Sequence, residues 1–260
     1  MAEVLRVWRT VEAGMSAAKQ WPTHGSLPRI LRRLTPFSYG QAGDGRERAL
    51  ARYVLANTPP GDLDAAIAAI DRFAYRNARL INIGEEKGAI LDAAVRAARP
   101  ARLLELGTYC GYSALRIARV MPPGAHLYSI ERGAANARVA ARIWRHAGVT
   151  DRVHGLVGTL DDGGATLGRL RGPVAGGLDF VFIDHGKDEY LSDLRLILGE
   201  RWLHPGSVVV ADNIEYPGAP AYRDYMRRHE GTLWSTVEHP THVEYQSELR
   251  DLVFESTYLG

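Results

Sequence analysis

The second half of the sequence alternates short apolar runs with segments of helical periodicity. Apolar runs of strand length predict five β-strands, at residues 102–106, 126–131, 153–157, 178–184 and 207–212. Segments whose apolar residues recur every three or four positions separate them and predict helices at residues 112–121, 134–147, 161–170 and 187–201. Several of the runs are apolar throughout, which is typical of parallel strands covered on both faces.

The flanking segments complete this pattern. Before it, periodicity predicts helices at residues 46–57, 62–78 and 85–100, with Asp62 as the N-cap of the second helix. After it, a helix near residues 219–229 precedes strand-like runs at 232–238 and 249–255. The sequence thus predicts an α/β fold, a doubly wound sheet with helices on both faces, in one domain over residues 46–260. Residues 1–45 form a predicted helical N-terminal arm.

Length and composition are those of one globular domain with an extension. The chain has 260 residues, of which 46% are hydrophobic and 24% are charged. Apolar runs fall short of the roughly 20 residues that cross a bilayer, and the N-terminus lacks the apolar core of a secretory signal. We therefore expect a cytoplasmic protein without a membrane span. Cys110 is the only cysteine, which excludes an intramolecular disulfide and a thiolate zinc cluster.

The net charge of +2 is unevenly distributed. Residues 1–50 contain eight basic and four acidic residues and carry +4, whereas the remainder of the chain carries −2. The basic character thus belongs to the N-terminal arm, and no nucleic-acid partner is expected. We interpret the arm as solvated helices with basic faces. Contact with an anionic surface, or with a second copy of the chain in a homo-oligomer, is the alternative.

Candidate chemistry lies where the predicted strands end, because doubly wound sheets bind ligands beyond the carboxyl ends of their strands. The first strand runs through Glu105 into Gly107 and Gly111, and these glycines let the backbone turn sharply and approach a ligand. Their G-x-x-x-G spacing differs from the dinucleotide pattern G-x-G-x-x-G, and a tight turn alone also requires glycine. Glu131 ends the second strand, where a carboxylate can bind the hydroxyls of a ribose. Together these residues favour a nucleoside ligand without a pyrophosphate.

Oxygen donors follow the fourth and fifth strands. Asp184 ends the fourth strand and is followed by His185 and Lys187, while Asp212 and Asn213 end the fifth. Because the ends of neighbouring parallel strands meet at one sheet edge, two carboxylates and an amide oxygen are expected to converge. Such ligands suit Mg²⁺. Each acid alone is also common as a helix cap or a loop residue.

Several motifs resemble the catechol O-methyltransferase family, which is S-adenosylmethionine-dependent and Mg²⁺-dependent. They are LELGTYCGYSALRIA, the strand end at Glu131, IDHGKDEY, VVVADNIEYPGAP and HVEY, in this order. The resemblance runs from about Arg46 to the C-terminus, some four-fifths of the chain, and leaves only residues 1–45 outside. It implies a Rossmann-like, mostly parallel sheet whose last strands include an antiparallel one. It also implies methyl transfer from S-adenosylmethionine to one hydroxyl of a small catechol substrate.

The resemblance gives individual residues a role. The metal ligands fall on Asp184, Asp212 and Asn213, the catalytic lysine on Lys187, and the partner of the second catechol hydroxyl on Glu244. Mg²⁺ would bind both catechol oxygens and make the nearer hydroxyl more acidic, and a neutral Lys187 amine would accept its proton. The expected cofactor contacts are Ile83, Glu105, Gly107, Tyr109, Gly111, Ser113, Glu131, Arg132, Gly158, Asp184 and His185.

The expected substrate pocket departs from that of the familiar animal enzymes. Their aromatic and thioether walls around the ring correspond here to Arg79, Ile81 and Gly186, whereas Pro217 is kept. Asn82 belongs to the same expected pocket. The small Gly186 and the charged Arg79 lead to the hypothesis of a wider pocket, or of one that accepts an anionic substituent.

Three other functions compete with this one. An O-methyltransferase for larger ortho-dihydroxy compounds, such as flavonoids, caffeoyl esters or secondary metabolites, would share the metal, the cofactor and the reaction. An NAD-linked oxidoreductase is disfavoured by the missing G-x-G-x-x-G motif. A non-catalytic S-adenosylmethionine-binding or scaffolding protein would have no use for Lys187 or Glu244.

Overall fold

The computed structural model describes residues 44–246 and 248–260. The predicted N-terminal arm, residues 1–45, lies almost wholly outside the described residues, and so does its suggested role in self-association. Within the described part, α3 (Arg46–Asn57), α4 (Leu63–Arg76) and α5 (Gly84–Ala98) precede the sheet. Asp62 caps α4 as predicted, because its side chain accepts a hydrogen bond of 2.8 Å from the N–H of Ala65. No helix of these residues has the length and hydrophobicity to cross a membrane.

A mixed sheet forms the centre of the described domain. Its strands are β1 (Arg102–Leu106), β2 (His126–Glu131), β3 (Val153–Val157), β4 (Leu178–Ile183), β5 (Leu203–Ala211), β6 (Trp234–His242) and β7 (Arg250–Tyr258). They lie in the order β3-β2-β1-β4-β5-β7-β6. β1 to β5 run parallel and β7 runs antiparallel to β5 and β6, which confirms the predicted Rossmann-like sheet. β5 begins earlier than predicted, since Pro205 and Gly206 weaken the strand pattern in the sequence.

Helices connect the parallel strands as the periodicity predicts, with differences at some ends. They are α6 (Tyr112–Val120), α7 (Ala134–Ala147), α8 (Ala165–Leu170) and α9 (Tyr190–Gly199), and a further helix, α10 (Pro220–Arg228), lies between β5 and β6. α8 begins later than predicted because Gly163 and Gly164 have φ of 71° and 91°, outside the helical range. The helix predicted at 187–201 starts as a 3₁₀ turn, η2 (Lys187–Glu189). An irregular turn that the sequence did not predict, η3 (Ile214–Gly218), follows β5.

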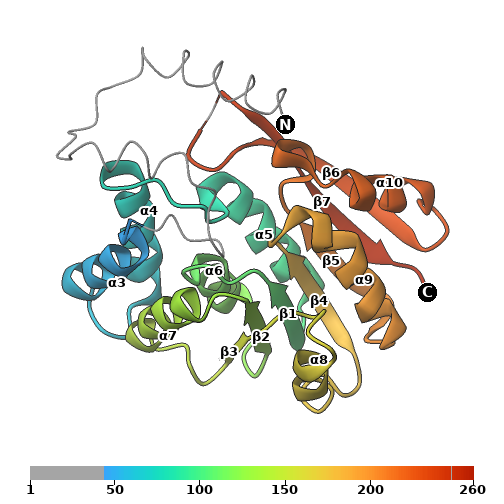
Figure 1. The fold of residues 1–260 in the computed structure, drawn as a ribbon, viewed down its shortest axis with the longest axis horizontal. Coiled ribbons are helices and arrows are strands. Elements are labelled where there is room, and N and C mark those ends of the chain that lie inside the picture. The colour runs from blue at the N-terminus through green and yellow to red at the C-terminus, as the bar shows by residue number, and fades with distance from the viewer. Residues whose placement is uncertain (1–43, 247) are drawn as a thin grey trace. The chain divides into compact units, whose positions relative to one another are not determined.

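Alternate residues of the central strands point to opposite faces and join separate cores. Leu103 and Phe180 pack with residues of α3 to α7, whereas Leu104 and Val181 pack with residues of α8, α9 and α10. Figure 1 shows α3, α4, α6 and α7 on one side of the sheet and α9 and α10 on the other. This burial on both faces explains why several strands are apolar throughout.

The strand register brings the ends of four strands into line. Ile130 of β2 pairs with Leu106 of β1, Leu106 pairs with Ile183 of β4, and Ile183 pairs with Ala211 of β5. The residues that follow these positions therefore lie at the same edge of the sheet. They include four residues singled out from the sequence: Glu131, Gly107, Asp184 and Asp212.

One carboxylate lies inside the sheet. Glu105 of β1 is fully buried, and its two oxygens accept hydrogen bonds from the hydroxyls of Ser113, near the start of α6, and Ser129 on β2. Burial raises the pKa of Glu105 to about 7, although both hydroxyls favour the charged form. Because both oxygens are bonded within the fold, Glu105 holds the start of α6 against β1 and β2.

This environment makes the free energy of unfolding depend on pH through Glu105. Its folded-state pKa of about 7 lies above the ordinary value of 4.5, so the native state holds the proton more tightly than the unfolded chain. The stability contributed by this group is therefore fully present below about pH 4.5 and is lost as the pH rises towards 7.

Glu105→Gln is expected to remove this pH dependence. Compared with the variant, the wild-type protein should lose on the order of 1–3 kcal/mol of unfolding free energy across that pH range. Denaturant unfolding of both proteins at several pH values measures the difference. A difference that stays constant with pH would contradict the raised pKa.

Candidate active site

Asp184 and Asp212 lie together at the carboxyl edge of the sheet. The N–H of Asp184 donates to the carbonyl of Leu106 at 2.8 Å, and that of Asp212 donates to the carbonyl of Ile183 at 3.1 Å. Burial raises the pKa of Asp184. Burial also raises the pKa of Asp212 to about 6, and the negative charge of Asp184 contributes to this rise. The two carboxylates are therefore close enough to repel one another.

Asn213 adds an amide to these carboxylates. Its backbone is left-handed, with φ of 56° and ψ of 39°, a conformation that asparagine tolerates better than most residues. Its side-chain nitrogen donates to Asp251 at 3.0 Å. Two carboxylates that repel one another and an amide oxygen form a donor set that fits Mg²⁺.

Lys187 lies beside this donor set. Its Nζ is 2.9 Å from Oδ1 of Asp184 and 2.8 Å from the hydroxyl of Tyr190. The Tyr190 hydroxyl donates in turn to the backbone carbonyl of Asp212, at 3.1 Å. Lys187, singled out from the sequence, thus contacts the candidate metal ligand Asp184 directly. It reaches a second candidate ligand, Asp212, through the hydroxyl of Tyr190.

A second lysine, Lys87 of α5, was not singled out from the sequence. Its side chain is fully buried, and its Nζ lies 2.8 Å from Asp212, 2.9 Å from Asp251 and 3.3 Å from Glu244. Burial alone would lower the pKa of Lys87, but the charges of the three carboxylates raise it well above its ordinary value. Lys87 therefore stays charged and ties α5 to the site.

Composition could have drawn attention to Lys87. Only three of the 32 Lys and Arg residues in the chain are lysine, namely Lys19, Lys87 and Lys187. Two of these three lie at the same site. The helical pattern gave no indication that Lys87 belongs to the site, although Lys87 lies on the buried face of α5 with Gly88 and Leu91.

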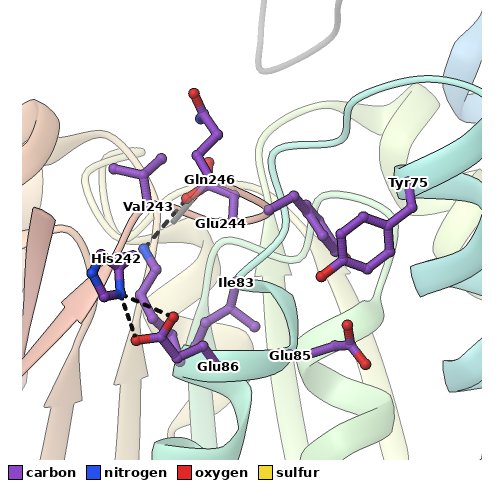
Figure 2. A pocket seen from close by; sticks show the side chains of 10 residues that line it. Tyr75, Ile83, Glu85, Glu86, His242, Val243, Glu244 and Gln246 are labelled. Atoms are coloured by element: carbon purple, nitrogen blue, oxygen red, sulfur yellow. Dashed lines mark hydrogen bonds and ion pairs between the residues drawn. The ribbon is translucent and has the colours of Figure 1, made fainter. Parts of the chain in front are cut away.

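A cavity of about 190 Å³ opens beside Glu244. Figure 2 shows the Glu86 carboxylate bonded to His242 at this cavity, and the shorter of their contacts is 3.0 Å. Burial raises the pKa of Glu244, while the charge of Lys87 opposes the rise. The cavity is lined by Tyr75, Ile83, Glu85, Glu86, Lys87, His242, Val243, Glu244, Tyr245 and Gln246.

Glu131 is held at the end of β2 by backbone donors. It accepts hydrogen bonds of 2.8 Å from the N–H of Tyr109 and 2.7 Å from the N–H of Gly133, and a longer one from Asn136. Its own backbone carbonyl accepts from the N–H of Gly158. A carboxylate has about four acceptor positions, so one remains for a ribose hydroxyl. Binding both hydroxyls would require Glu131 to release one of these three donors, of which the Asn136 side chain makes the longest bond.

The turn after β1 packs against the turn after β4. Gly107 has φ of 105°, and a Cβ there would lie 2.1 Å from the carbonyl oxygen of Asp184 and 3.1 Å from the backbone nitrogen of His185. Gly111 has φ of 86°, and a Cβ there would lie 2.4 Å from the indole nitrogen of Trp144. Both positions of the turn after β1 therefore require glycine for close packing, whether or not a ligand is bound.

Two predicted site residues have buried polar atoms with no hydrogen-bond partner among the described residues. These atoms are the side-chain oxygen and nitrogen of Asn82 and Nδ1 of His185. Asn82 precedes Ile83, which lines the cavity, and His185 follows Asp184. Buried polar groups are normally satisfied, so these atoms are candidates for contact with a cofactor or substrate.

The remaining predicted pocket residues lie at the protein surface. Arg79, Ile81, Gly186 and Pro217 are exposed, and the cavity beside Glu244 is not lined by any of them. Burial raises the pKa of Glu244, and the charge of Arg79 acts in the opposite direction, so Arg79 lies within electrostatic reach of that carboxylate. The structure does not gather the four residues into that cavity.

A second group of potential metal donors lies next to Asp184 in the sequence. Ligand atoms of His185, Glu189 and Asp193 lie within 4.8 Å of one another. Nε2 of His185 is 2.9 Å from Asp193, and Glu189 forms an ion pair with the exposed Arg132. These contacts explain why the three side chains lie together without a bound ion. Arg132, a predicted cofactor contact, is paired with Glu189.

Relatives of known family confirm the resemblance that the motifs indicate. Residues 62–237 match the family model described as O-methyltransferase. A probable O-methyltransferase of Mycobacterium tuberculosis is 60% identical over 223 residues, which cover 85% of this chain and 95% of the relative. Catechol O-methyltransferase B of Danio rerio is 37% identical over 215 residues, which cover 83% of this chain and 80% of that protein.

Solved structures share the fold. The O-methyltransferase from Bacillus cereus in complex with SAH has a TM-score of 0.62 at 22% identity, covering 81% of this chain and 97% of that one. The O-methyltransferase TomG from Streptomyces achromogenes, involved in tomaymycin synthesis and solved with SAM, has a TM-score of 0.63 at 23% identity, covering 83% and 99%. With the family match, the sequence relatives and the fold in agreement, the chain belongs to the O-methyltransferase family.

Proposed function

We propose that this O-methyltransferase transfers a methyl group from S-adenosylmethionine to one hydroxyl of a catechol, with Mg²⁺ bound by Asp184, Asp212 and Asn213. The observation that carries the proposal is the meeting of these oxygen donors with Lys187 at one sheet edge, close to Glu244. A catechol presents two adjacent hydroxyls. The metal and a carboxylate together can bind such a pair.

Strand ends and relatives support S-adenosylmethionine as the methyl donor. Gly107 follows β1 and Glu131 ends β2, at the edge where doubly wound sheets hold nucleosides. His185 and Asn82 offer buried polar atoms that lack a partner in the described part of the chain. The Bacillus cereus enzyme was solved with SAH and TomG with SAM, and both share this fold. The donor supplies the sulfonium methyl group as the electrophile.

The side chains divide the remaining chemistry. When bound, Mg²⁺ supplies positive charge that makes the nearer catechol hydroxyl more acidic. Lys187 accepts the proton of that hydroxyl at Nζ, an atom that Asp184 and Tyr190 hold in place. Glu244 accepts a hydrogen bond from the second hydroxyl and so orients the ring. Alignment of the attacking oxygen with the methyl group supplies much of the acceleration.

Larger ortho-dihydroxy compounds, such as flavonoids, caffeoyl esters or other secondary metabolites, are the second candidate substrates. The exposure of Ile81, Gly186 and Pro217 favours them, because an open surface accommodates substituents beyond the ring. The metal, the cofactor and the reaction would be unchanged. Lys187 and Glu244 argue against a pure binding protein, and an NAD-linked oxidoreductase does not fit the family.

Asp184→Ala is expected to abolish methylation, because the variant loses a carboxylate ligand of the ion. In an assay with S-adenosylmethionine and a panel of catechols, the wild-type enzyme should lose activity in EDTA and regain it when Mg²⁺ is returned. A monophenol should be inert, since it offers one oxygen only. Asp224→Ala, at an exposed aspartate of α10, is the control and should keep wild-type turnover. Turnover that survives EDTA would contradict the metal assignment.

Lys187→Ala is expected to lower kcat by about 10²- to 10⁴-fold, the usual contribution of a general base. Binding of S-adenosylmethionine and Mg²⁺, measured by calorimetry, should remain nearly intact. Lys187→Arg distinguishes a role in accepting the proton from a role of the positive charge alone. Arginine can keep the ion pair with Asp184 but cannot lose its proton. Both variants should be slow. Full activity in the arginine variant would remove Lys187 from the proton transfer.

Arg79→Ala is expected to change substrate preference. Arg79 is exposed, so losing its charge should lower kcat/KM for a carboxylated catechol such as caffeate by about twofold to fivefold. Turnover of an uncharged catechol should stay the same, and Arg76→Ala, at another exposed arginine, should change neither value. A wild-type preference for uncharged catechols would count against a pocket adapted to anions.

A further inference from the structure

Asp251, at the start of β7, lies against the turn that follows β5. It is 2% exposed. Its Oδ2 accepts hydrogen bonds from Nζ of Lys87 at 2.9 Å and from the side-chain nitrogen of Asn213 at 3.0 Å. Its Oδ1 accepts from the backbone N–H groups of Glu215 at 3.2 Å and Tyr216 at 2.9 Å. One buried carboxylate therefore holds both the side chain of Asn213 and the backbone after it.

This contact decides which way the Asn213 amide faces. An ionised carboxylate can only accept hydrogen bonds, so the group turned towards Asp251 is the NH₂ donor. The amide oxygen of Asn213 consequently faces away from Asp251. Its orientation is fixed by the protein before any ion binds.

Lys87 joins the same network to the rest of the site. Its Nζ contacts Asp251 and also Asp212 and Glu244. The ammonium group keeps Asp212 and Asp251 beside one another, although both are buried and acidic. The turn that carries Asp212 and Asn213 is thus anchored from α5 and from β7.

We propose that Asp251 is a positioning residue that presents the oxygen of Asn213, and the Asp212–Asn213 turn, to the divalent cation. It contacts neither substrate nor cofactor and acts through Asn213 and Lys87. This inference rests on the proposed function, because it assumes a cation at this edge of the sheet. Groups that orient a metal ligand in this way commonly change metal affinity by 10- to 100-fold when they are removed.

Asp251→Asn tests the proposal with little change in shape. The oxygen of the new amide is needed by the backbone N–H groups of Glu215 and Tyr216, so its NH₂ would face Lys87 and the NH₂ of Asn213. Two donors cannot bond one another. The Asn213 amide is then free to turn its nitrogen towards the cation, which weakens cation binding.

Titration with Mn²⁺, followed by the electron paramagnetic resonance of the free ion, measures this effect without relying on activity. We expect the dissociation constant of Mn²⁺ to rise about 10- to 100-fold in Asp251→Asn, while affinity for S-adenosylmethionine is unchanged. Excess Mg²⁺ should restore most of kcat. Asp92→Asn is the matched control, because Asp92 is also a buried partner of basic side chains but pairs with Arg116 and Arg119.

The possible results distinguish the metal site from the positioning role of Asp251. If wild type binds no Mn²⁺, the metal assignment fails and the inference fails with it. If wild type binds Mn²⁺ and Asp251→Asn binds it equally well, or if Asp92→Asn weakens binding to the same extent, only the positioning role is overturned.

A measurement on the wild-type protein decides the matter if Asp251→Asn does not fold. In protein labelled with ¹⁵N at asparagine, the side-chain NH₂ of Asn213 should give one pair of signals, protected from hydrogen exchange before Mg²⁺ is added. Rapidly exchanging signals that become protected only with Mg²⁺ would mean that the metal, not Asp251, orients the amide.

Discussion

Four carboxylates, those of Asp184, Asp212, Glu244 and Asp251, gather at the edge of the sheet and must be balanced by positive charge. Each unpaired buried charge costs several kcal/mol of folding free energy, so the site must contain nearly as much positive as negative charge. Lys87 contacts three of the four carboxylates and Lys187 contacts the other. Before a cation binds, with all four carboxylates ionised and both amines protonated, two negative charges are left over, which one divalent cation would neutralise. A bound cation would also favour the neutral form of the Lys187 amine, the form that accepts the substrate proton. Charge balance and donor chemistry therefore lead to the same kind of ion.

The topology of the sheet makes this gathering possible. Parallel strands β4 and β5 deliver Asp184 and Asp212 to one edge, because their register aligns the strand ends. The antiparallel β7 then returns beside β5, with Phe254 paired to Ala211, so Asp251 lies next to the turn that leaves β5. The connection from β6 to β7 carries Glu244 to the same place. The antiparallel pair thus supplies the acids that the parallel strands lack.

Sequence patterns predicted what depends on local periodicity and on strand order. The five parallel strands, the cap at Asp62 and the alignment of Asp184 with Asp212 follow from those rules. Lys87 and Asp251 escaped prediction because their partners are distant along the chain. Lys87 is 125 positions from Asp212 and 164 from Asp251, and a lysine in a helix gives no local sign of such contacts. The exposed placement of Gly186 and Pro217 likewise depends on tertiary structure.

The scarcity of lysine has a practical consequence for handling this protein. Reagents that acylate or reductively alkylate amines find few targets on a chain with three lysines, and Lys87 is shielded by burial. The side chain of Lys187 is 18% exposed, so such reagents can reach the amine beside the donor set. Besides Lys19 and the α-amino group, amine-based labelling or immobilisation would therefore modify an amine at the candidate active site. Coupling through the abundant arginines would leave that amine intact.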